Sequence, residues 1–199
     1  MRKIIGLLLI IVLLVMLLSN GNTKALLLAT ELPIGTSASQ VYANLYEYLA
    51  CLGYAEWRGE DFEGQISGFA VLINRVQHSD FPDTYYDVIT EDNPRQFTPV
   101  RSDGLIYANK SVVTFDMVPQ KTLDALDRAL AGEDPTEMLL EKETERLLAE
   151  GSKLKLEPSA YYQGGAVFFM TEKAFQNFKD GVAVYVTIDH HVFFRAWSL

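Results

Sequence analysis

Two glutamates four residues apart, Glu56 and Glu60, stand in the block EWRGE and could exchange protons with a substrate. Upstream of them, apolar residues recur at the spacing that gathers side chains on one helix face. They are Val41, Leu45, Leu49 and Leu52. Glu56 is the next member of this series, so we expect its carboxyl group to lie partly out of water. Desolvation raises the pKa of a carboxyl group, as a proton donor working near neutral pH requires. The alternative is an exposed glutamate at a frayed helix end.

The elements that must position these glutamates can be predicted from periodicity and breakers. Ser37 or Ser39 can cap the helix that leads to Glu56, and Gly59 ends it. Asp61 can cap a second helix up to residue 76, and residues 79–104 are typical of a long loop. Further helices are expected over 120–131 and 136–150, and strands over 166–170, 182–188 and 191–197.

Short motifs follow the EWRGE block in a fixed order. They are GQISGFAVLINRV (64–76), FPDTYYDVI (81–89), QFTPV (96–100) and SDGLIY (102–107), with weaker continuations at 129–136, 164–169 and 190–197. The succession resembles the SleB/CwlJ family of bacterial cell-wall hydrolases. An ordered set over ~50 residues is far more specific than a lone short motif. The chain departs from the family pattern at Trp57, in an apparent insertion over 137–160, and at MTEKAF (170–175).

The resemblance implies the fold class and the activity. We expect an α+β fold: a mainly helical, lysozyme-like or transglycosylase-like domain with a small C-terminal antiparallel β-sheet. The implied partner is the peptidoglycan glycan strand, cleaved at its β-1,4 bonds, and the family's cortex-lytic members imply a lytic transglycosylase. Such an enzyme needs one residue, here Glu56, as general acid and then base. A muramidase or glucosaminidase would use water and a second carboxylate such as Glu60 or Asp103, and a non-catalytic wall-binding module is the third alternative.

Substrate contacts are expected from polar and aromatic residues near these motifs. The candidates are Glu60, Gln65, Phe97, Thr98, Asp103 and Tyr162. Each has a structural alternative: Glu60 could pair with Arg58 or Arg75, the polar side chains could serve turns and caps, and the rings could belong to the core.

Neither a metal nor a cofactor is predicted. Asp189, His190 and His191 are adjacent, but successive side chains of a strand point to opposite faces. With only His78 elsewhere, a zinc site of the usual ligand number has little support.

Composition restricts the partners. The net charge of −9 argues against nucleic-acid binding, which relies on Lys and Arg. The single cysteine, Cys51, excludes an intrachain disulfide and is expected to be a small buried residue.

The N-terminus predicts export. Arg2 and Lys3 precede the apolar run 4–18, which suits either a signal peptide cleaved after Ala25 or a membrane anchor over 1–25. Residues 26–37 are predicted to be a linker, and residues 38–199 the catalytic domain. The protein is therefore expected in the cell envelope, secreted or anchored in the cytoplasmic membrane through residues 4–18.

Overall fold

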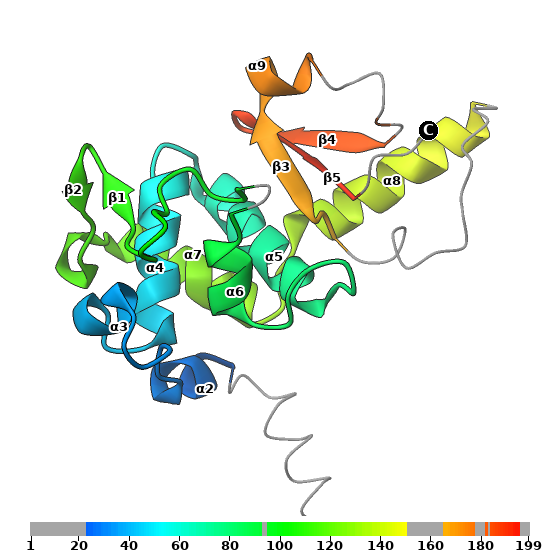
Figure 1. Ribbon diagram of the computed structural model, residues 1–199. Coiled ribbons are helices and arrows are strands. Elements are labelled where there is room, and N and C mark those ends of the chain that lie inside the picture. Colours follow the sequence, from blue (N-terminus) through cyan, green and yellow to red (C-terminus); the bar gives the residue numbers. More distant parts are fainter. Residues whose placement is uncertain (1–22, 93–94, 151–164, 178–181, 183, 196–199) are drawn as a thin grey trace, which may run out of the picture.

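Helices build most of the molecule, and one small sheet lies at one end of them (Figure 1). The structure is a computed structural model that describes residues 23–92, 95–150, 165–177, 182 and 184–195. The helices are α2 (Thr23–Ala29), α3 (Ser37–Val41), α4 (Leu45–Trp57), α5 (Phe62–Gln77), α6 (Tyr85–Thr90), the 3₁₀ helix η1 (Phe115–Met117), α7 (Gln120–Leu130), α8 (Pro135–Ala149) and α9 (Glu172–Phe175). The strands are β1 (Tyr107–Ala108), β2 (Ser111–Val112), β3 (Phe168–Thr171), β4 (Tyr185–Ile188) and β5 (His191–Phe194).

Helices α4, α5 and α7 pack together at the centre of the molecule. Helix α4 begins where the Asn44 side chain accepts a hydrogen bond from the Glu47 N–H, and α5 begins where Asp61 accepts one from Gly64. These caps satisfy N–H groups that have no partner inside a helix. The buried leucines of the predicted stripe, Leu45, Leu49 and Leu52, face the core.

Two glycines let aromatic rings into the contact between α4 and α5. A Cβ atom on Gly53 would lie 2.1 Å from the Phe69 ring, and one on Gly68 would lie 2.5 Å from the Trp57 indole. Trp57 is 1% exposed, with ring centroids 5.0 Å from Phe69 and 5.8 Å from Phe169. Trp57 thus fills the space beside Gly68 and packs the C-terminal end of α4 against α5.

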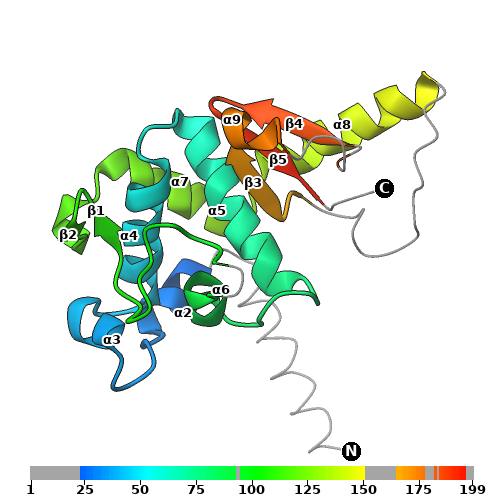
Figure 2. The same cartoon turned by 45° about the horizontal axis from the view of Figure 1, so that its top comes forward.

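The C-terminal strands form an antiparallel sheet in the order β3-β5-β4. The register pairs Phe169 with Phe193 and Ile188 with His191. Helix α8 runs beside β4, and Leu140 of α8 packs in a cluster with Ile188 and Phe193 (Figure 2). The expected α+β class, a mainly helical domain with a small C-terminal antiparallel sheet, is confirmed.

Several predicted boundaries need correction. The helix leading to Glu56 is interrupted: Thr36 caps α3, Asn44 caps α4, and Val41 is 39% exposed rather than part of the buried stripe. The segment 79–104, predicted as loop, contains α6.

Two segments were predicted to be a linker and an insertion. Their described residues pack against the core of the domain. Residues 26–37 do not form a free linker, because Leu27 and Leu32 are buried in the main core and α2 packs against α4. The apparent insertion 137–160 begins within α8, whose Leu140 is fully buried. Residues 1–22 of the expected leader 1–25, and residues 151–160, lie outside the described residues, whereas residues 23–25 belong to α2. Within the described part of the chain, no helix has the length and apolar character needed to span a bilayer.

Candidate active site

Glu56 lies in the last turn of α4 and is partly buried. Burial raises the pKa of its carboxyl group to about 7, while a hydrogen bond from the Thr98 backbone N–H and the positive charge of Arg75 act in the opposite direction. Burial therefore outweighs two interactions that favour the charged form. Near neutral pH this group is present in both protonation states, so it can give a proton and take one back.

Arg75, from α5, is a buried cation whose charge lowers the pKa of Glu56. It is 3% exposed, its Nε donates to the Val167 carbonyl oxygen at 2.7 Å, and it interacts electrostatically with Glu91 as well as Glu56. Burial lowers the pKa of its guanidinium to about 10. Arg75 therefore bonds a carbonyl group that is distant in sequence and not a local one.

Aromatic rings surround the Arg75 guanidinium. Its central carbon lies 5.3 Å from the Phe81 centroid, 5.2 Å from that of Phe97 and 5.8 Å from that of Phe169. Rings at this range attract a cation through their quadrupole. The rings therefore stabilise the buried charge of Arg75.

A small surface hollow with a volume of about 10 Å³, open to solvent, lies on the segment that carries Phe97. Its walls combine acidic and basic side chains with apolar ones. They are Ile89, Thr90, Glu91, Asp92, Arg95, Phe97, Val100, Arg101 and Ser102. Because the next residue, Thr98, binds Glu56 through its backbone, the pocket lies close to the candidate acid.

Glu60 has a different environment from Glu56. It is 8% exposed, and its carboxylate accepts a hydrogen bond of 3.1 Å from the His190 backbone N–H. His191 Nδ1 lies 3.2 Å from the other carboxylate oxygen. The expected pairing with Arg58 or Arg75 is wrong, since Glu60 faces the turn between β4 and β5.

The predicted substrate contacts fall into three groups. Gln65 is 1% exposed and bonds Thr122 at 2.9 Å and the Glu60 carbonyl at 3.2 Å, and Phe97 is 0% exposed. Both therefore serve the core, as does the Glu60 carboxylate, and we correct the expectation that they touch substrate. Thr98 and Asp103 are exposed, although Asp103 also accepts a turn hydrogen bond from Leu105 N–H. Tyr162 lies outside the described residues.

Sequence reasoning missed Glu91 as a neighbour of Arg75 and missed the contact between Glu60 and the histidine pair. Glu91 carried no periodic signal, because it follows the short helix α6 inside a predicted loop. The histidines were visible, but only the turn geometry brings them to Glu60. Cys51, by contrast, is 0% exposed as expected, and burial raises the pKa of its thiol to about 12.

The comparisons with known proteins agree with the motif order. Residues 59–141 match the family model described as cell wall hydrolase. This segment of the chain is therefore similar to cell wall hydrolases. Glu56 lies just upstream of the matched segment, in the same EWRGE block. The resemblance to the SleB/CwlJ hydrolases is thereby confirmed.

Relatives of this chain include spore cortex-lytic enzymes. That of Bacillus cereus is 36% identical over 107 residues, which are 54% of this chain and 35% of that protein. That of Bacillus subtilis is 36% identical over 113 residues, or 56% of this chain and 32% of that protein. The match thus spans about a third of the length of these relatives. A solved structure, the catalytic domain of the germination-specific lytic transglycosylase SleB from Bacillus anthracis, is 26% identical with a TM-score of 0.48, covering 82% of this chain and 99% of that domain.

Proposed function

We propose that the protein acts in the cell envelope and cleaves the β-1,4 backbone of peptidoglycan as a lytic transglycosylase, with Glu56 as its single acid and base. The observation that carries the proposal is the partly buried Glu56 carboxyl group with a pKa of about 7. The EWRGE block, the match to the cell wall hydrolase family and the names of the relatives supply the substrate class.

Glu56 gives one proton to the leaving group and takes another from the attacking hydroxyl, so it ends in its starting state. The Glu56 carboxylic acid protonates the glycosidic oxygen, and the bond from that oxygen to the anomeric carbon of the muramoyl residue breaks. The oxocarbenium-like centre is then attacked by the 6-hydroxyl of the same sugar, whose proton passes to the Glu56 carboxylate. The product is a 1,6-anhydro end, and no water is consumed.

The surroundings of Glu56 suit both halves of this cycle. The protonated form is favoured by burial, which prepares the acid. The anion that forms after proton transfer is stabilised by the Thr98 N–H and by the Arg75 charge. These two interactions keep the pKa near neutrality, so neither form is too stable to react.

The state of the other carboxylates favours a single-acid mechanism over hydrolysis. An inverting or retaining hydrolase needs a second carboxylate that can reach water or the anomeric carbon. Glu60, the carboxylate nearest to Glu56 in sequence, is buried against the β4–β5 turn and does not reach either one. Thr98 and Asp103 remain our proposed contacts to sugar hydroxyl or N-acetyl groups, because both are exposed on the loop that touches Glu56.

The decisive experiment weighs the products. The full chain is incubated with purified peptidoglycan in water enriched in ¹⁸O, and the released fragments are analysed by mass spectrometry. A transglycosylase gives anhydro ends that are one water lighter than reducing ends and contain no ¹⁸O. A muramidase or glucosaminidase gives reducing ends labelled with ¹⁸O, which would refute the transglycosylase mechanism.

The role of Glu56 is tested by a conservative substitution. Glu56→Gln should lower the rate by ~10²–10⁴, the usual contribution of a general acid. Glu145→Gln, on the exposed face of α8, is the control and should retain full activity. An active Glu56→Gln variant would refute the assignment, and a wild-type chain that binds glycan without releasing products would favour a non-catalytic wall-binding module.

A further inference from the structure

The turn between β4 and β5 brings chemistry-bearing side chains to Glu60. Ile188 and His191 form the last pair of the ladder, so Asp189 and His190 make up the turn itself. Asp189 has a φ of +50°, a left-handed conformation that Asp adopts more readily than most residues. Side chains of a turn need not alternate between two faces. The sequence argument against a metal assumed that successive side chains alternate as they do in a strand. That argument therefore does not apply to this turn.

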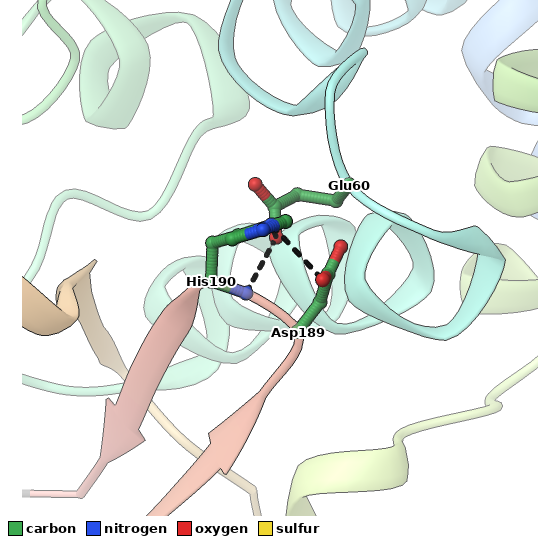
Figure 3. A group of neighbouring side chains, drawn as sticks. All are labelled: Glu60, Asp189 and His190. Carbon is green, nitrogen blue, oxygen red and sulfur yellow. Dashed lines mark hydrogen bonds and ion pairs between the residues drawn. The ribbon is translucent and has the colours of Figure 1, made fainter.

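Three of these side chains converge on one point, as Figure 3 shows for Glu60, Asp189 and His190. One ligand atom from each of these residues can be chosen so that all three lie within 4.8 Å of one another. His190 Nδ1 is 2.9 Å from Asp189 Oδ1 and 3.5 Å from Glu60 Oε2. The Glu60 side chain is 9% exposed, that of Asp189 20% and that of His190 73%. The cluster is thus anchored in the interior and open to solvent on the His190 side.

The three ligand atoms lie within 4.8 Å of one another, so the side chains would draw together around a tetrahedral ion. Zinc binds imidazole nitrogen and carboxylate oxygen at ~2.0–2.2 Å, which puts two ligands of a tetrahedral site about 3.3–3.6 Å apart. The two distances from His190 Nδ1 lie on either side of the lower end of that range. Two carboxylates and an imidazole leave one position for water, the ligand number found in open zinc sites.

His191 supplies an independent observation. Its side chain is 12% exposed, and its buried Nδ1 has no hydrogen-bond partner among the described residues, although it lies 3.2 Å from Glu60 Oε1. At this distance the two groups form an ion pair when His191 is protonated. A nitrogen in this position can hold the outer oxygen of a carboxylate whose other oxygen binds a metal.

We propose that Glu60, Asp189 and His190 form a site for a divalent transition-metal ion, zinc in the first instance, and that His191 orients Glu60. The ion would join the loop that follows Glu56 to the β4–β5 turn, two segments separated by nearly the whole domain. Asp61 N–H already donates to Asp189 Oδ2 at 2.7 Å, and Lys121 Nζ and Gln65 Nε2 donate to the Glu60 carbonyl oxygen. These bonds fix both sides of the site before the metal arrives. The proposal does not depend on glycan cleavage.

The experiment is a titration of the metal-free full chain with zinc chloride in the presence of a chromophoric chelator of known affinity. Wild-type protein should bind one equivalent. His190→Ala and Asp189→Asn should each weaken binding by more than roughly 100-fold, since even outer-shell partners of a metal commonly contribute ~10–100-fold. His78→Ala is the matched control, because His78 ends α5 and is the only other histidine of the chain.

Two further readouts keep the test independent of any folding defect. Cobalt bound to wild-type protein should give the visible absorption of a tetrahedral site, and saturating zinc should raise the melting temperature of wild type but not of Asp189→Asn. Magnesium should bind far more weakly, since imidazole is a poor ligand for it. The proposal is overturned if wild type binds no zinc, if His78→Ala loses binding as much as His190→Ala does, or if magnesium binds equally well. In the first case the cluster is an ion-paired latch only.

Discussion

Replacing Glu56 by glutamine should stabilise the protein, and more so as the pH rises. The folded protein holds the pKa of this carboxyl group at about 7, against a value of 4.5 for the unperturbed group. In the unfolded chain the group loses its proton near pH 4.5, so between these two values the unfolded state binds fewer protons than the folded state. Stability from this group is therefore lost as the pH rises and is fully lost above the folded pKa.

The magnitude follows from the difference between the two pKa values. At ~1.4 kcal/mol per pH unit, ionising Glu56 in the fold costs about 3 kcal/mol. Glutamine has nearly the same shape and carries no charge at any pH. The advantage of Glu56→Gln over wild type should therefore grow by about 2–3 kcal/mol between about pH 5 and about pH 8.

The assay is urea unfolding followed by tryptophan fluorescence, for wild type and Glu56→Gln at both pH values. Other titrating groups are common to the two proteins and cancel in the difference. Glu145→Gln is the control: this side chain is exposed on α8, so we expect its small effect to be the same at both pH values. If Glu56→Gln also differs from wild type by the same amount at both, burial does not perturb Glu56 and the basis of the proposed function is lost.

Three further predictions follow from the same packing. Turnover of peptidoglycan should fall as the pH rises above about 7, because Glu56 must begin protonated; a pH profile that stays level to about pH 9 would contradict this. Arg75→Met should destabilise the fold by ~3 kcal/mol, measured by urea unfolding, because the Val167 carbonyl loses its donor. It should also shift the alkaline fall in activity to higher pH, because a charge that lowers the pKa of Glu56 is gone. Arg75→Lys is the variant that keeps the charge. Gly53→Ala should lower the free energy of unfolding by about 1–3 kcal/mol although alanine is the better helix former, because its Cβ would meet Phe69 at 2.1 Å. Gly59→Ala has no atom within 4 Å of the added carbon and should be nearly neutral in the same unfolding assay.

The part of the site that could be predicted from sequence depends on local spacing. Helical periodicity placed Leu45, Leu49 and Leu52 on one buried face and made Glu56 its continuation, and Asp61 was recognisable as a cap from its position before an apolar run. Both inferences need only residues a few positions apart. The family resemblance then supplied the activity, which no local pattern contains.

The rest depends on contacts between segments far apart in sequence. The pKa of Glu56 depends on its interactions with Thr98 and Arg75, which are distant in sequence. Gln65 is polar, but its side-chain amide is buried and bonded to Thr122. Residues 26–37 were assigned to a linker for their Pro and Gly, yet Leu27 and Leu32 fill gaps that only the assembled helices create. The rule for strands was applied to Asp189 and His190, although these two residues lie in a turn.

The different environments of Glu56 and Glu60 connect the two proposals. The two carboxylates are four residues apart, but the Arg58–Gly59 turn between them ends α4 and sends the second toward another part of the fold. Glu56 stays beside the exposed Thr98 segment and titrates near pH 7, whereas Glu60 is held by the β4–β5 turn. A second catalytic carboxylate would have to be free to approach water or the anomeric carbon. Engaging Glu60 with the histidines, and with a metal if one binds, removes the nearest candidate; in the mechanism that we propose, Glu56 alone gives a proton and then takes one from the attacking hydroxyl.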